Sequence, residues 1–399
     1  MFMAAPASRM QNFSLSPTAA MLAKVTELRQ QGKDIISLNI GEPDFDTPAF
    51  ICKAAAEAMD TGFTRYTTES GFPELRRAIA KKLKEENGID YALNEITTTV
   101  GAKQALFAAL MVIAQPGDEV LLPIPCWVSY TEMVKLSGST PVFVPVRQDD
   151  YALDLEAIEK AITPCTKAIV ICSPNNPTGA VYSEESLRHL ARLAEEHDFF
   201  IISDEIYEKL IYDDAEHFSI ASISPQIRAR TITINGFSKA YAMTGWRIGY
   251  AAARSDITKG IIAIQSQTTS CANSIAQKAA LAALEGPQDD VSAMASAFKE
   301  RRDYVHARLN AMEGILCPKP QGAFYCYPNI QAFLGKSFRG TRIESAVDLC
   351  QYLLEEALVS TVPGEAFHLP GRLRISYSNS MENLKTAMDR MEQALNQLL

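Results

Sequence analysis

Short apolar runs rich in β-branched residues recur along the first two thirds of the chain, and stretches with helical spacing separate many of them. The runs lack the alternation of polar and apolar positions that marks a half-exposed strand, so they predict strands buried on both faces. Strands that alternate with helices predict a parallel sheet covered by helices on both sides. The predicted strands lie at residues 96–100, 119–123, 141–146, 167–173, 199–203, 231–235 and 246–253.

The pattern changes after about residue 254, where helical stretches become long and strands become rare. A short strand at 359–362 and the segment "RLRISYS" are the main strand candidates in this part of the chain. This C-terminal part and the N-terminal segment together indicate a smaller α+β region. The helices expected outside the regular alternation cover residues 16–32, 256–285, 289–313, 343–357 and 381–398.

We therefore expect an α/β fold with two domains. The large domain covers residues 48–290 and contains a mostly parallel seven-stranded sheet covered by helices. The smaller α+β domain combines residues 1–47 with residues 291–399. A chain of 399 residues is long enough for such a division.

Composition and charge exclude several classes of function. The chain is 47% hydrophobic and 21% charged, which is ordinary for a globular protein. Its formal net charge is −9 and no basic patch is visible, so nucleic acid and anionic membrane are not expected as partners. No apolar run approaches the length of a membrane span, and the first residues do not read as a signal peptide.

The eight cysteines predict neither disulfides nor a metal centre. None forms a C-x-x-C pair, and no Cys/His cluster has the spacing of zinc ligands. Most lie in apolar runs such as "AIVICSP" and "FYCYP", which favours buried free thiols. Free thiols fit a reducing compartment, and we expect a cytoplasmic protein without a bound metal.

Polar or glycine-rich segments follow four of the predicted strands. The segment "GAK" follows 96–100, "PNNPTG" follows 167–173, "DEIY" follows 199–203 and "GFSK" follows 231–235. In open α/β sheets, ligands bind at the carboxyl edge of the strands. The sequence therefore predicts that these four segments surround one binding site.

The side chains at these strand ends suggest carbonyl chemistry. Lys239 could form a Schiff base with a carbonyl, although a single lysine in a loop is usually just solvated. Asp204 ends an apolar run and could pair with a buried cation, such as a protonated pyridine nitrogen; a helix N-cap or a surface ion pair is the simpler alternative. Asn176 lies in a rigid turn that could point its amide outward, and this turn sequence also needs no function.

A phosphate site is suggested by the segment after the first of these strands. Gly101 and Ala102 open a helix, whose free N–H groups favour a phosphate. Arg247 could add a fixed positive charge, although either feature alone is common without a ligand. An amine, an acid, an amide donor and a phosphate site together match pyridoxal phosphate (PLP), whose enzymes use a lysine and an acidic residue in this way.

Three segments, "SPNNPTG", "SDEIY" and "SKAYAMTGWRIGY", resemble the signature segments of the class I aminotransferases of PLP fold-type I. The order of further segments also matches, from "LNIGEPDFDTP" through "YTTESGFPELR", "GAKQAL", "PCWVSY" and "GAFYCYP" to "RISYS". The resemblance covers nearly the whole chain and points to the bacterial aspartate aminotransferase branch typified by thermophile enzymes. Each segment alone is moderately specific, whereas all of them in this order are very specific.

The resemblance implies roles for the matching residues. Lys239, Asp204 and Tyr207 would be catalytic. The residues implied to bind the cofactor are Tyr66, Gly101, Ala102, Lys103, Trp127, Asn176, Asp204, Tyr207, Lys239 and Arg247. The residues implied to bind the substrate are Gly41, Trp127, Asn176 and Arg374.

Several of these roles are specific. Trp127 would stack on the cofactor ring, and Arg374 would bind the α-carboxylate of the substrate. Tyr66 would reach the phosphate in the neighbouring subunit, so the resemblance also implies a homodimer. Some relatives carry a hydroxyl at the position of Gly236, and Ser238 is the candidate to replace it here.

The substrate is less sharply indicated. A dicarboxylic substrate needs a second cation, for which Lys103 or an arginine of the partner subunit is a candidate. Part of the aspartate branch has a lysine where this chain has Ser14, and that lysine is associated with prephenate, so prephenate is not expected. We expect aspartate and 2-oxoglutarate in a ping-pong reaction. An aromatic or broad-specificity aminotransferase is the alternative, followed by a PLP-dependent C–S β-lyase.

Overall fold

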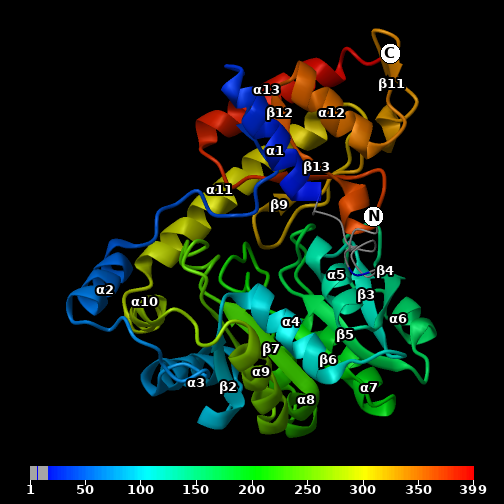
Figure 1. Cartoon of the computed structure of the whole chain (residues 1–399). Coiled ribbons are helices and arrows are strands. Elements are labelled where there is room, and N and C mark those ends of the chain that lie inside the picture. The colour runs from blue at the N-terminus through cyan, green and yellow to red at the C-terminus, as the bar shows by residue number, and fades with distance from the viewer. Residues whose placement is uncertain (1–6, 8–16) are drawn as a thin grey trace, which may run out of the picture.

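The computed structural model of the chain describes residue 7 and residues 17–399. Helices and strands alternate along these residues and then give way to a helix-rich C-terminal part (Figure 1). The longer helices are α1 (Pro17–Gln30), α2 (Ala49–Asp60), α3 (Pro73–Asn87), α4 (Ala102–Ile113), α5 (Val128–Leu136), α6 (Leu155–Ala161), α7 (Glu184–Glu196), α8 (Pro225–Arg230), α9 (Ser255–Thr268), α10 (Ser274–Glu285), α11 (Asp289–Ala311), α12 (Ala346–Glu356) and α13 (Met381–Leu395).

A seven-stranded sheet forms the centre of the larger body, as the sequence predicts. Its order is β2-β8-β7-β6-β5-β3-β4. Only β8 runs antiparallel to its neighbours within this sheet, and the other adjacent pairs are parallel. The strands are β2 (Ile96–Thr99), β3 (Glu119–Ile124), β4 (Thr140–Pro145), β5 (Thr166–Cys172), β6 (Phe200–Asp204), β7 (Thr231–Gly236) and β8 (Gly249–Ala252).

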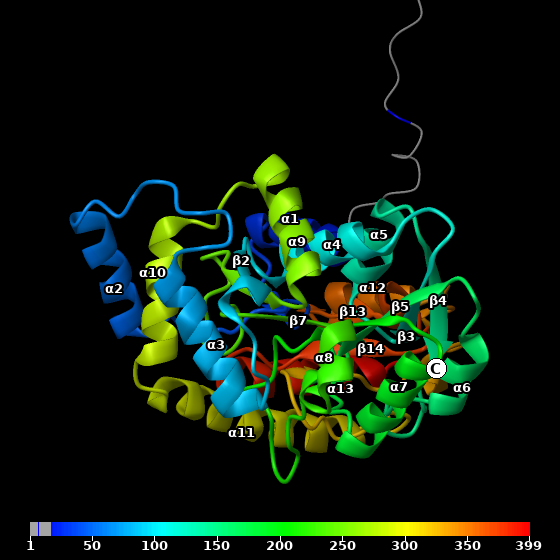
Figure 2. The ribbon, with the colours of Figure 1, turned by 90° about the horizontal axis from the view of Figure 1, so that it is seen from below.

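Both faces of this sheet are covered by helices, which explains the continuous apolar runs. Successive side chains of a strand point to opposite faces. Val170 of β5 accordingly packs in a core with α4, α5 and α9, whereas Ile169 and Ile171 pack in a second core with α6, α7 and α8. Figure 2 shows α4 and α9 on one side of the strands and α7 and α8 on the other.

A second group of elements lies over the carboxyl edge of the sheet (Figure 1). It contains α1, α12, α13, most of α11 and a three-stranded sheet of order β13-β14-β9. The N-terminal strand joins this group, because β1 pairs in parallel with β12. The short strands are β1 (Ile36–Ser37), β9 (Tyr325–Cys326), β10 (Ser337–Phe338), β11 (Thr341–Arg342), β12 (Val359–Ser360), β13 (Val362–Pro363) and β14 (Leu373–Ser376). The exact domain boundaries that the sequence suggests stay a prediction.

Two predicted elements differ from the structure in extent. The helical stretch 256–285 is interrupted between Thr268 and Ser274, because Ser270 has a φ of 58° and the side chain of Asn273 caps the start of α10. The strand predicted from residue 246 begins only at Gly249, because Arg247 has a φ of 53° and cannot continue an extended strand.

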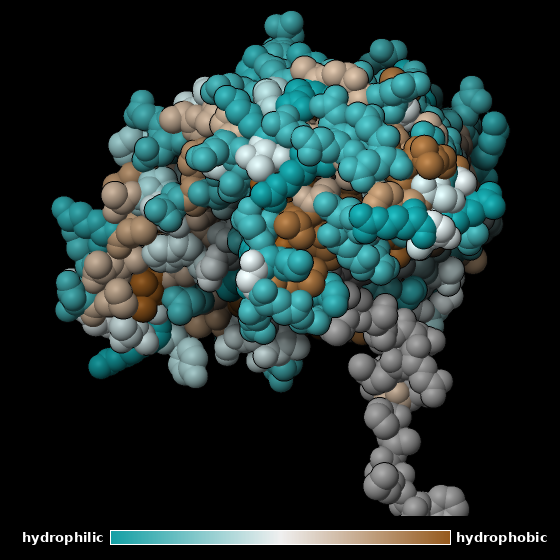
Figure 3. Space-filling view, turned by 90° about the horizontal axis from the view of Figure 1, so that it is seen from above, coloured by the Kyte–Doolittle hydropathy of each residue, from teal (hydrophilic) through white to brown (hydrophobic). Residues whose placement is uncertain are grey.

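The face shown in Figure 3 is largely hydrophilic, with small separate apolar patches. Among the residues that the structure describes, no helix has both the length and the apolar character needed to cross a bilayer. All eight cysteines are free thiols, and five of them are buried.

Candidate active site

A cavity of about 320 Å³ opens at the carboxyl edge of the large sheet. The segments after β2, β5, β6 and β7 contribute to its lining, as predicted from the four strand ends. The predicted site residues that line it are Gly41, Ala102, Lys103, Trp127, Asn176, Asp204, Tyr207, Lys239, Arg247 and Arg374. Four of these side chains are cationic and one is a carboxylate, so the cavity is strongly positive.

Lys239 lies three residues beyond the end of β7, and its amine points into the cavity. The Lys239 Nζ atom donates a hydrogen bond of 2.6 Å to the backbone carbonyl of Gly41. The pKa of Lys239 is lowered to about 8, mainly by burial and also by the positive charges of Arg374 and Arg247, which act against the charge of Glu42. An amine with this pKa is neutral in a useful fraction of molecules near neutral pH.

Asp204 is the last residue of β6 and is only 3% exposed. Its position in the ladder puts it beside Cys172 of β5 and Ile234 of β7. Burial raises the pKa of Asp204 to about 6, and the hydrogen bond from Tyr130 opposes that rise. A buried carboxylate of this kind favours a cationic partner in the cavity.

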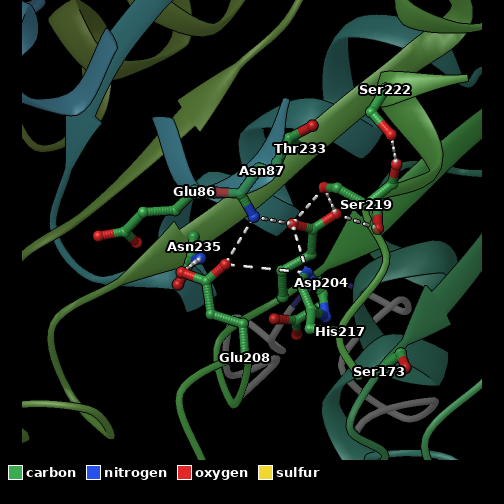
Figure 4. A network of polar contacts seen from close by, with 12 residues as sticks. Glu86, Asn87, Ser173, Asp204, Glu208, His217, Ser219, Ser222, Thr233 and Asn235 are labelled. Atoms are coloured by element: carbon green, nitrogen blue, oxygen red, sulfur yellow. Dashed lines mark hydrogen bonds and ion pairs between the residues drawn. The ribbon is translucent and has the colours of Figure 1, made fainter. Parts of the chain in front are cut away.

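The residues that directly follow Asp204 in the chain belong to a network of charged and polar side chains (Figure 4). Glu205 accepts hydrogen bonds from the hydroxyls of Ser203 (2.9 Å) and Ser219 (2.6 Å), and His217 lies 3.1 Å from it. Glu208 binds the ammonium group of Lys82, which comes from α3. Asn87 and Asn235 donate to Glu208, each at 2.7 Å.

The carboxylates and the imidazole of this network are spaced as in a cation site. The ligand atoms of Glu205, Glu208 and His217 all lie within 4.8 Å of one another. The cation that the cluster holds is the protein's own Lys82, which explains why the pKa of Glu208 falls to about 2 despite burial. The network fixes the segment after β6 to α3 and β7, and so supports the position of Asp204.

Tyrosine, asparagine and arginine side chains meet on the opposite wall of the cavity. The hydroxyl of Tyr207 is 2.9 Å from that of Tyr325 on β9. Arg374 of β14 donates to the side-chain oxygen of Asn176 at 3.1 Å and to the backbone carbonyl of Asn39 at 2.8 Å. Arg374 is 3% exposed, and its Nε atom has no partner in the part of the chain that the structure describes. A buried guanidinium with an unused donor is suited to a carboxylate ligand.

Two glycines shape the part of the cavity where α4 begins. Gly101 has a φ of 79°, and a side chain on it would come within 2.6 Å of Arg247 Nη2. A side chain on Gly249 would come within 2.6 Å of the backbone nitrogen of Ala102. The two glycines therefore let Arg247 and the free N–H groups of the helix approach the same place, which is the usual design of an anion site.

Lys103 and Trp127 form the remaining part of the wall. The Lys103 ammonium lies 4.8 Å from the centroid of the Trp127 ring. Burial lowers the pKa of Lys103, and the charge of Arg247 lowers it further. Lys103 is thus a partly buried cation in a cavity that already contains three others.

The remaining predicted positions differ in where they lie relative to this cavity. Tyr66 lies in the loop after α2, is 89% exposed and does not line the cavity of its own chain. Gly236 packs closely against β8, since a side chain on it would come within 3.0 Å of the Gly249 Cα atom, whereas Ser238 does line the cavity. Ser14 lies outside the described residues.

Sequence reasoning missed two aromatic residues of the site. Tyr130 is one helical turn from Trp127, and this spacing in "PCWVSY" was the available signal. Tyr325 belongs to the segment "GAFYCYP", and its side chain lies against Gly41 and below the Arg374 guanidinium, 4.6 Å from the ring centroid. Its contacts come from three separate segments, so no local pattern could reveal them.

Known proteins are similar to this chain in both sequence and architecture. The family model "Aminotransferase class I and II" matches residues 33–391. The chain is 44% identical over 387 residues to an aspartate aminotransferase of Bacillus sp. strain YM-2, covering 97% of this chain and 98% of the relative.

Solved structures give the same result. The aspartate aminotransferase of Rhizobium meliloti superimposes with a TM-score of 0.96 and 42% identity, covering 99% of this chain and 100% of that one. The aspartate aminotransferase of Thermus thermophilus with maleate superimposes with a TM-score of 0.93 and 43% identity, covering 98% of this chain and 100% of that one.

Proposed function

This chain belongs to the class I and II aminotransferases, and we propose that it uses PLP to move the amino group of L-aspartate to 2-oxoglutarate. The observation that carries the proposal is the cavity in which Lys239, with a lowered pKa, and the buried Asp204 face the same space. An amine and an acid are the two groups that a pyridine aldehyde cofactor requires.

The residues of the cavity fit PLP. Asp204 is a buried carboxylate with no cation bound to it within the described chain, and the protonated ring nitrogen would supply one. The cradle of Gly101, Ala102 and Arg247 would hold the phosphate. Trp127 would cover one face of the ring, and Asn176 and Tyr207 would bind its phenolic oxygen. We keep Ser238 as the candidate hydroxyl for the phosphate.

Each side chain would have a distinct task in the reaction. When bound, PLP supplies an electron sink for the bond that breaks at the substrate Cα atom. Lys239 would remove the Cα proton and later act as the acid, for which its lowered pKa is suited. Asp204 would keep the ring nitrogen protonated, and each pKa unit of that effect is worth about 1.4 kcal/mol.

The charges of the cavity favour a dicarboxylic substrate. Arg247 is assigned to the phosphate, Lys239 to the cofactor aldehyde and Arg374 to the α-carboxylate. Lys103 is then the remaining cation of the lining, and a second substrate carboxylate would neutralise it. The similar Thermus thermophilus structure contains maleate, which is also a dicarboxylate.

We also propose a homodimer located in the cytoplasm. Tyr66 is 89% exposed in the isolated chain, which fits a residue that completes the phosphate site of a neighbouring subunit. Free thiols at all eight cysteines fit a reducing compartment.

The first experiment is a titration of the purified, PLP-loaded protein with L-aspartate while its visible absorbance is recorded. We expect the band of the bound aldehyde form to be replaced by that of the amine form, and 2-oxoglutarate to restore it. A band that responds to phenylalanine or tyrosine and not to aspartate contradicts the substrate. Pyruvate, ammonia and a thiol formed from a cysteine thioether, without a 2-oxo acid, indicate a C–S β-lyase. A protein that binds no PLP overturns the site assignment.

A further inference from the structure

The two oxygens of the Asp204 carboxylate have different surroundings. Tyr130 Oη donates a hydrogen bond of 2.6 Å to Asp204 Oδ2. Asp204 Oδ1 accepts a longer bond of 3.3 Å from the backbone N–H of Ile206. Tyr130 is 2% and Asp204 3% exposed, so water does not compete freely for either group. One oxygen is therefore held firmly, and the other keeps the capacity to accept a stronger donor.

The helix α5 brings Tyr130 to this position together with Trp127. The two residues are one helical turn apart, and their rings meet edge to face with centroids 5.4 Å apart. Both line the cavity. The start of α5 thus presents an aromatic ring to the cavity and a hydroxyl to the acid that faces it.

We propose that Tyr130 is a positioning residue that fixes the Asp204 carboxylate and leaves its other oxygen available to the ring nitrogen of PLP. The inference rests on the proposed function, since it assumes that Asp204 meets this nitrogen. Tyr130 acts only through Asp204 and is not assigned any contact with substrate.

The electrostatics around Asp204 give the hydroxyl a second effect. Burial raises the pKa of Asp204, the Tyr130 hydrogen bond lowers it, and the charges of Glu205 and Lys239 act in opposite directions. Burial followed by the charge of Asp204 raises the pKa of Tyr130 well above its usual range, and burial does the same for the nearby Cys172 thiol. Tyr130 therefore remains a neutral donor across the working pH range and favours the ionised form of Asp204.

The test compares Tyr130→Phe with Tyr91→Phe in the full-length protein. Tyr91 is a matched control because it is 4% exposed and its hydroxyl lies 3.3 Å from Thr233 Oγ1, but it does not line the cavity. We measure the dissociation constant of PLP for each apoprotein and the pH dependence of kcat/KM for each loaded enzyme.

Loss of a hydrogen bond to a buried charge predicts roughly tenfold to hundredfold weaker PLP binding in Tyr130→Phe. The acid limb of its pH profile should move to higher pH, because Asp204 loses the bond that favours ionisation. Tyr91→Phe should match the wild type in both measurements. A Tyr130→Phe variant with unchanged PLP affinity and an unchanged acid limb overturns the inference.

A second variant separates the hydrogen bond from packing. Tyr130→His keeps an aromatic ring with an N–H donor, and we expect it to bind PLP at least several-fold more tightly than Tyr130→Phe. Equal weakening in both variants, with the apoprotein unfolding temperature lowered equally, shows a packing role and overturns the inference. A wild-type protein that fails to bind PLP refutes the proposed function itself, which this comparison distinguishes from a failure of Tyr130 alone.

Discussion

Lys239 donates a 2.6 Å hydrogen bond to the backbone carbonyl of Gly41, across 198 positions of the chain. The contact joins the turn after β7 to the loop that follows β1, and β1 pairs with β12 of the C-terminal region. The amine proposed for catalysis is thus held at the place where the two parts of the molecule meet. The residues around the Lys239 amine determine its pKa and how its removal changes activity and stability.

Replacing Lys239 with methionine should abolish amino transfer while leaving a folded protein. Loss of a positioned proton-transfer group costs roughly 10²–10⁴-fold in rate, and Lys239 is also the proposed attachment point of the cofactor. Single-turnover measurements with aspartate test this, with circular dichroism as the check on folding. Wild-type turnover in the variant would refute the role of Lys239.

The same variant should change the pH dependence of stability. The pKa of Lys239 is about 8 in the folded protein, against 10.5 for a lysine in the unfolded chain. Between these two pH values the unfolded chain therefore binds more protons than the folded protein. Stability of the wild-type apoprotein therefore rises with pH in this window relative to Lys239→Met. Near pH 7, removal of the buried charge should raise the free energy of unfolding of Lys239→Met above that of the wild type by on the order of 1–3 kcal/mol. Loss of the hydrogen bond to Gly41 should offset about 1 kcal/mol of this gain.

Urea denaturation from pH 7 to 10.5 measures this difference. Lys259→Met is the control, because Lys259 is an exposed lysine of α9 and its replacement removes a lysine without opening the cavity. A stability difference between wild type and Lys239→Met that does not change with pH would contradict the lowered pKa.

Gly101→Ala should weaken PLP binding, whereas Gly62→Ala should not. Both glycines have positive φ values, 79° and 75°, so alanine strains the backbone at each, and the ψ of 162° at Gly101 lies in a region that is almost exclusive to glycine. Only at Gly101 would the new side chain meet a neighbour, Arg247 Nη2 at 2.6 Å, whereas Gly62 has open space. Displacing this guanidinium should raise the dissociation constant of PLP by roughly tenfold or more. Equal affinities of the two variants would argue against the cradle.

Lys103→Gln should change substrate preference and not the reaction itself. If Lys103 binds the second carboxylate, kcat/KM for aspartate should fall roughly tenfold to hundredfold, while kcat/KM for phenylalanine should change little. Arg374→Gln is the matched comparison. Because it removes the partner of the α-carboxylate, which both amino acids have, it should lower kcat/KM for aspartate and for phenylalanine. Equal losses for aspartate and phenylalanine in Lys103→Gln would assign this lysine to the cofactor.

The parts of the site that follow strands were predictable from the sequence because buried parallel strands appear as plain apolar runs. Asp204 and Lys239 stand out at the ends of such runs, and the topology of the sheet then brings them to one edge. The helix N-terminus after β2, at Gly101 and Ala102, was predictable in the same way.

The contacts made across long sequence distances were not predictable. The bond between Tyr130 and Asp204 spans 74 positions, and nothing local in either segment specifies it. The break in the expected helix 256–285 depends on the positive φ of Ser270. A serine in the sequence does not indicate this backbone conformation. The buried pairing of Glu208 with Lys82 spans 126 positions and was likewise invisible.

His217→Gln should destabilise the protein below neutral pH and much less at high pH. Burial by itself would lower the pKa of His217, but the charge and hydrogen bond of Glu205 and the charge of Glu208 outweigh burial and the charge of Lys82, and raise it. The folded state therefore binds the proton more tightly, so this stabilisation is complete below the unfolded pKa of about 6.5 and is lost as pH rises through the folded value.

Urea denaturation at pH 6 and pH 9 provides the measurement for His217→Gln. Removing one partner of a buried charged network costs about 1–3 kcal/mol, and we expect a loss of this size at pH 6. His197→Gln at the exposed end of α7 serves as the control and should track the wild type at both pH values. A loss that is equal at pH 6 and pH 9 would mean that His217 acts by packing alone and that its charge does not stabilise the network.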